Sequence, residues 1–147
     1  MRVKQKGSNA MTDIQALLDA ISESGRRERS NYHVTLGRLI EELEKLNNEG
    51  WDRPVVFAHG GSPRSPHSYR GYYSDLSFES GGEIMAKELA AICRDALGRT
   101  FEGYKGGDYV MSKETPLWAA PYGCCGLAIV SIIVTADKVI LGTKEVD

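Results

Sequence analysis

The sequence predicts one α+β domain in which about three helices pack on one face of a mainly antiparallel sheet. The chain has 147 residues, of which 41% are hydrophobic, and this is enough to build one core without metal or disulfide support. Two segments with helical periodicity are each followed by a strand-like run, and the C-terminal part is rich in β-branched residues. Helix-then-strand units followed by a hairpin are typical of helices layered on an antiparallel sheet.

The N-terminal part divides into a tail and a helix. Residues 1–11 are basic and carry almost no apolar side chain, so we expect a disordered extension or a cloning remnant, with the single domain at 12–147. Thr12-Asp13-Ile14-Gln15 has the form of a capping box, and Gly25 is expected to end the helix. One face of this helix is apolar: Ile14, Leu17, Leu18 and Ile21.

The next helix has the most regular apolar pattern in the chain. We expect it to begin at Thr35 and to stop at Gly50. Its apolar stripe consists of Leu36, Leu39, Ile40, Leu43 and Leu46. The basic residues Arg26, Arg27 and Arg29 precede it, and we expect them to be solvated in a linker.

The middle of the chain alternates between strands and helices. Residues 53–58 hold an apolar triplet after a proline and predict a strand. Residues 59–70 are dense in Gly, Ser and Pro and predict a long loop. A strand over 72–80 and a third helix that is capped at Gly98 follow.

The C-terminal part predicts strands and turns. Residues 101–111 form a strand interrupted at Gly106-Gly107, and residues 116–122 are short and turn-rich. The β-branched run 127–135 predicts a strand that is buried on both faces. After a turn, residues 138–141 form a last, exposed edge strand, which would permit a homodimer by strand pairing.

Charge and cysteine content exclude several classes of protein. Eighteen basic against 20 acidic residues give a formal charge of -2, so nucleic acid is not favoured as a partner. Three cysteines, two of them adjacent at Cys124 and Cys125, do not form a disulfide framework, and we expect reduced thiols in the cytoplasm. No apolar run is long enough to span a bilayer, so no membrane role is expected.

Three segments hold residues that core packing does not require. They are Ser68–Tyr73, Gly103–Tyr109 and Thr115–Trp118, with Tyr122-Gly123 close behind the last of them. They bring together aromatic rings, cations or hydroxyls, and glycines that let backbone amides approach a ligand. This is the chemistry needed to hold a phosphate and to stack a base.

The predicted binding site combines the three segments. Arg70 and Lys105 would bind phosphate, and Tyr104, Tyr72 or Trp118 would stack on a base. The full predicted set is Tyr69, Arg70, Tyr72, Tyr104, Lys105, Asp108 and Trp118. A purely structural interpretation stays open, because Tyr and Gly are common in the bends of twisted sheets.

No motif predicts a metal, a cofactor or a catalytic residue. His33, His59 and His67 lack the spacing of zinc ligands, and no phosphate-binding glycine motif precedes a helix. Four acidic residues could form an acid pair, although charges on strands are more typical of a solvent face: Asp75, Glu79, Glu102 and Asp108.

The three motifs also carry a resemblance to a family. In order, Ser68-Tyr69-Arg70-Gly71-x-Tyr73, Gly103-Tyr104-Lys105-Gly106-Gly107-x-Tyr109 and Thr115-Pro116-Leu117-Trp118 resemble small, uncharacterised proteins of tailed phages, over about residues 35–133. The resemblance implies a phage source and supplies no mechanism. Small phage accessory proteins often counter host defence, and this is an analogy of genome context.

Three hypotheses about function follow. The leading one is a non-enzymatic phage accessory protein that binds a phosphate-bearing small ligand, such as a nucleotide signal, to counter host defence. The second is an interaction protein that inhibits a host protein or nucleic-acid complex through the segment 59–70 and the tyrosines. The third is a cryptic nucleotide hydrolase that depends on Asp108.

Overall fold

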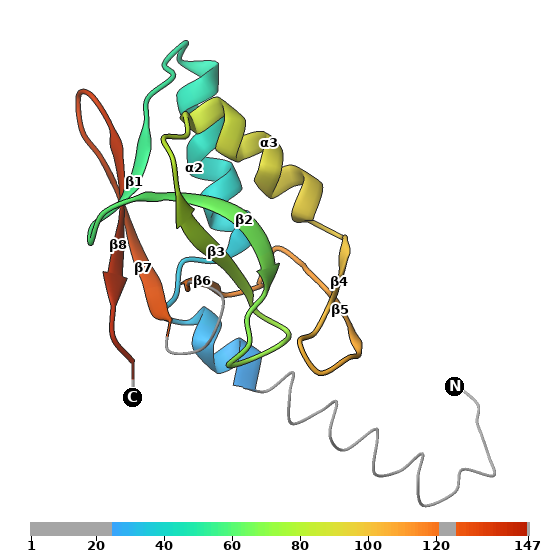
Figure 1. The fold of residues 1–147 in the computed structure, drawn as a ribbon. Coiled ribbons are helices and arrows are strands. Elements are labelled where there is room, and N and C mark those ends of the chain that lie inside the picture. Colours follow the sequence, from blue (N-terminus) through green and yellow to red (C-terminus); the bar gives the residue numbers. More distant parts are fainter. Residues whose placement is uncertain (1–24, 121–125, 147) are drawn as a thin grey trace, which may run out of the picture.

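The computed structural model describes residues 25–120 and 126–146, and within them two packed helices lie against one side of a strongly curled sheet (Figure 1). The elements are α2 (Leu36–Asn48), β1 (Val55–Phe57), β2 (Ser62–Ser68), β3 (Leu76–Gly81), α3 (Ala86–Ala96), β4 (Thr100–Glu102), β5 (Asp108–Val110), β6 (Leu117–Ala119), β7 (Leu127–Val134) and β8 (Val139–Lys144). No helix in these ranges has the length and apolarity that a membrane crossing requires.

The main sheet is mixed, and the prediction of a mainly antiparallel sheet is wrong. Its strand order is β1-β8-β7-β6-β3-β2, and β4 pairs with β5 in a separate hairpin. The pairs β1–β8 and β3–β6 are parallel, whereas the other three are antiparallel. Strands β1 and β2, at the two ends of this order, lie in contact, so the six-stranded sheet is nearly closed like a barrel. Both parallel pairs join strands that are far apart in sequence, and local sequence patterns do not predict such pairing.

The helix α2 confirms the predicted stripe. Thr35 caps it, because the amide of Arg38 donates to Thr35 Oγ1 at 3.3 Å. Gly50 follows its end at a positive φ of 76°. All five stripe residues are buried: Leu36, Leu39, Ile40, Leu43 and Leu46. They form one core with α3, which lies against α2 on the same side of the sheet (Figure 1).

The segment predicted as a loop over 59–70 contains a strand instead. Strand β2 pairs antiparallel with β3, and its register shifts between Arg64 and Pro66. Two prolines are tolerated because β2 is an end strand of the sheet, where one row of N–H groups is not needed for pairing. Composition predicted the irregularity correctly but not the pairing.

The C-terminal strands also correct two predictions. Strand β7 is not buried on both faces, because Ile133 and Val134 are exposed and Val130 is half-buried. Strand β8 is not an edge strand, because β1 and β7 pair with it on either side. The proposed route to a homodimer by pairing at residues 138–141 is therefore closed.

A short helical segment, residues 25–30, leads into α2 (Figure 1). Gly25 is the first described residue and is itself helical, contrary to the prediction that it ends a helix. Arg29 is packed against the sheet and is not solvated in a linker. The predictions for residues 1–24, including the capping box and its apolar face, lie outside the described residues.

Candidate functional site

Four arginines lie over aromatic rings in the described part of the chain, and one of them differs from the rest. The guanidinium carbons lie 3.0–4.6 Å from the ring centroids in the pairs Arg29–Tyr72, Arg53–Trp51, Arg70–Tyr104 and Arg99–Phe101. Arg29 and Arg99 also pair with carboxylates, and Arg53 donates to a backbone carbonyl. Of these four, Arg70 is the one whose guanidinium has no hydrogen bond or ion pair to another residue within 25–120 and 126–146.

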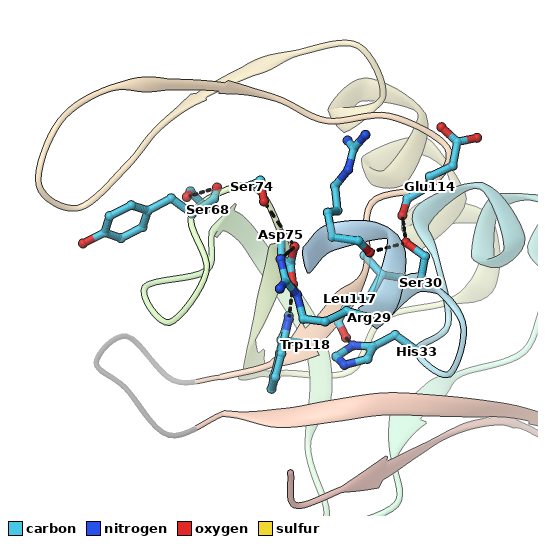
Figure 2. Close-up of polar contacts among 11 residues, drawn as sticks. Arg29, Ser30, His33, Ser68, Ser74, Asp75, Glu114, Leu117 and Trp118 are labelled. Atoms are coloured by element: carbon cyan, nitrogen blue, oxygen red, sulfur yellow. Dashed lines mark hydrogen bonds and ion pairs between the residues drawn. The ribbon is translucent and has the colours of Figure 1, made fainter. Parts of the chain in front are cut away.

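Arg29 belongs to a buried polar network that joins the helical segment to the sheet (Figure 2). Its Nε and Nη2 donate to the two Asp75 oxygens at 2.6 and 2.9 Å. Trp118 Nε1 donates to Asp75 Oδ2 at 2.8 Å. The Asp75 side chain is fully buried, so this paired arrangement satisfies a carboxylate that would otherwise be costly to bury.

Aromatic rings surround this network. Tyr69 stacks on Trp118 at 4.2 Å between ring centroids, and its hydroxyl accepts a hydrogen bond from the Gly126 amide at 3.1 Å. Both rings are buried, whereas Tyr72, which lies over Arg29, is half exposed. Trp118 and Tyr69 therefore form a second, smaller core, together with Ala120 and Ala128.

His33 packs against the Trp118 ring and extends the network. Its Nδ1 donates to the Leu117 carbonyl at 3.1 Å, which leaves Nε2 as a bare acceptor with no partner among the described residues. The His33 and Trp118 rings meet edge to face at 4.6 Å. Burial lowers the pKa of His33, although the Leu117 hydrogen bond and the nearby Asp75 charge act in the opposite direction.

Arg70 lies in a separate groove with a volume of about 580 Å³. The groove is formed by β2, β3, the segment after β2 and strand β4 with the turn that follows it. Its described lining residues are His67, Ser68, Arg70, Glu79, Glu102 and Tyr104. The volume falls within the range of about 300–1,000 Å³ that is typical of small-molecule sites.

Two glycine amides of the second motif are used within the β4–β5 hairpin. Gly106 and Gly107 adopt positive φ angles of 96° and 88°. The amides of Gly103 and Gly106 donate to carbonyls within the turn, at 2.9 Å each. The turn presents Tyr104 and Lys105 at the hairpin end, where both are exposed.

The structure divides the predicted site residues among three places. Arg70 and Tyr104 meet in the groove, with the guanidinium carbon 3.3 Å from the ring centroid. Tyr69, Tyr72 and Trp118 belong to the Asp75 network instead. Lys105 and Asp108 are exposed and are not among the described residues that line the groove. Arg70 and Tyr104 are therefore the predicted residues best placed to meet a ligand.

Three residues of the Asp75 network escaped prediction or were misplaced. Asp75 is fully buried, although its position on a strand predicted a solvent-facing charge. The sequence predicts Arg29 in a solvated linker, and it predicts no structural role for His33. The one available signal was the helical spacing of Arg26, Arg29 and Ser30, which is compatible with a continued helix that faces the sheet.

The site offers little for metal or thiol chemistry among the described residues. No group of three or more His, Cys, Asp or Glu side chains there could hold a metal ion. Burial raises the pKa of the Cys93 thiol to about 12, so this thiol is neutral at physiological pH. Cys124 and Cys125 lie outside the described residues.

Comparisons with known proteins give no relative: no family model matches the chain, and neither the search of curated proteins nor that of solved structures found a match. Function must therefore be argued from the site itself.

Proposed function

We propose that this chain is a non-enzymatic binding protein that holds a phosphate-bearing small ligand, a nucleotide, in the groove around Arg70. One observation carries the proposal. The Arg70 guanidinium carbon lies 3.3 Å from the Tyr104 ring centroid in a groove of ligand size, yet no acceptor among the described residues uses its donors.

The physical case rests on preorganisation. A guanidinium has five N–H donors in a planar fork that matches phosphate in a bidentate manner. Contact with the ring restricts the guanidinium before the ligand arrives, which reduces the entropy lost on binding. Tyr104 is 65% exposed, so part of its ring is open for a base to stack on.

The biological setting is part of the proposal. The resemblance to tailed-phage proteins supports a role in which the chain sequesters a nucleotide signal in the host cytoplasm and so counters host defence. An interaction protein that inhibits a host complex would use the same exposed tyrosines, but it would need no nucleotide. Ligand titration therefore separates the two functions.

The test is thermal unfolding in the presence of mono-, di- and cyclic nucleotides and of inorganic phosphate. A nucleotide at a hundred times its Kd should stabilise the fold by about 2.7 kcal/mol. Arg70→Ala should weaken binding and so reduce this stabilisation. Arg99→Ala is the matched control, because Arg99 also stacks on a ring but lies outside the groove lining. A panel in which no nucleotide moves the wild-type melting curve contradicts the proposal.

A further inference from the structure

The groove around Arg70 also contains carboxylates, and these restrict the ligand. Glu79 of β3 and Glu102 of β4 line the same groove. His67 Nδ1 lies 3.7 Å from Glu79 Oε2, whereas Glu102 has no hydrogen bond or ion pair within the described ranges. A ligand that is anionic along its whole length would meet repulsion from Glu102. The groove therefore suits a ligand with an anionic end for Arg70 and N–H donors elsewhere.

The position of Glu102 relative to Tyr104 further restricts the ligand that the groove can bind. Only Gly103 separates the two residues along the chain, and both line the groove. Arg70 covers one face of the Tyr104 ring, and the side chain remains 65% exposed. A flat ring that stacks on Tyr104 would thus have an acceptor carboxylate near its edge.

We infer that the groove selects guanine among the nucleobases, with Glu102 accepting hydrogen bonds from the base. This inference rests on the proposed nucleotide-binding function. An ionised carboxylate can only accept hydrogen bonds. Guanine offers two adjacent donors, N1–H and the N2 amino group, which match the two carboxylate oxygens. Adenine places its acceptor N1 beside its amino group, so a carboxylate at that edge meets one donor and one repulsive lone pair.

The experiment is calorimetric titration of the full chain with GMP, AMP and IMP. GMP is expected to bind at least about tenfold more tightly than AMP, the discrimination typical of a good bidentate base contact. IMP keeps N1–H but lacks the amino group, and its affinity should lie between the two. Glu102→Gln replaces one acceptor oxygen by a donor. In this variant the affinities for GMP and AMP should differ by no more than about threefold, while AMP binding is retained.

Matched variants test whether Glu102 itself causes the preference for GMP over AMP. Asp108→Asn removes the same charge from the residue opposite Glu102 in the hairpin, outside the described groove lining, and should leave the ratio unchanged. Arg70→Ala should weaken GMP and AMP equally. If wild type binds GMP and AMP within twofold, the guanine inference is overturned and nucleotide binding stands. A tenfold preference that persists in Glu102→Gln also overturns it. If no nucleotide binds, both proposals fall together.

Discussion

Two arginines of this chain lie over tyrosine rings, and their surroundings are opposite. Arg29 lies 3.9 Å from the Tyr72 ring centroid and gives its donors to the buried Asp75 carboxylate. Arg70 lies 3.3 Å from the Tyr104 ring centroid and has no acceptor among the described residues. The first pair closes a network inside the fold, whereas the second faces a groove.

The difference shows that an arginine–tyrosine contact does not by itself mark a binding site. Sequence alone presents Arg70 between two tyrosines as the stronger pair and leaves Arg29 without any role. The presence or absence of a carboxylate partner distinguishes the structural pair from the proposed recognition pair. For Arg29 that partner is 46 residues away along the chain.

Removing each arginine tests the comparison most directly, and the largest effect is expected at Arg29. Arg29→Ala leaves the Asp75 charge buried without its cation, and the free energy of unfolding should fall by about 3–5 kcal/mol. Arg70→Ala should change it by no more than about 0.5 kcal/mol, because Arg70 makes no ion pair within the described chain. Urea unfolding of both variants measures the two values.

Arg29→Lys provides a second measurement if Arg29→Ala does not fold. Lysine retains the charge but not the two parallel hydrogen bonds, so an intermediate loss is expected. Equal destabilisation by Arg29→Ala and Arg70→Ala would show that the two pairs have the same role and would remove the distinction drawn here.

The pH dependence of stability is the next largest effect, and it belongs to the Asp75 network. Burial lowers the pKa of His33 in the folded state below its ordinary value of about 6.5. The unfolded chain therefore binds more protons than the folded chain at acidic pH. Stability from this residue is complete above about pH 6.5 and is lost as the pH falls toward the lower, folded-state pKa, by at most about 1.4 kcal/mol per pH unit.

His33→Gln isolates this contribution from the other histidines. Urea unfolding at several pH values between 7.5 and 5 should show a shallower loss of stability for the variant than for wild type. The groove around Arg70 is lined by His67 and not by His33, so any nucleotide binding there should be the same in the variant as in wild type. Parallel stability curves for the two proteins would contradict the role given to His33.

The sequence predicted the parts of this molecule that depend on local patterns. The apolar spacing of Leu36 to Leu46 defines α2, because a helix buries neighbours three and four residues apart. The parallel pairs of the sheet and the burial of Asp75 depend instead on segments that meet only in the fold. For the site, Arg70 and Tyr104 could be predicted together, whereas Glu79 and Glu102 could not be placed in a groove without the structure.

The two tyrosines should give the smallest changes in stability, and one substitution should affect binding while the other affects stability. Tyr104→Leu removes the ring that contacts Arg70 and that we propose stacks on the base, so nucleotide binding should weaken by about 1–3 kcal/mol with little change in stability. Tyr72→Leu removes the ring over Arg29, so stability should fall by about 1 kcal/mol while binding is retained. Calorimetric titration measures nucleotide binding of both variants, and urea unfolding measures their stability. If Tyr72→Leu weakens binding as much as Tyr104→Leu, the Asp75 network and the groove act as one site, because only coupling between them would transmit a change that lies outside the groove lining.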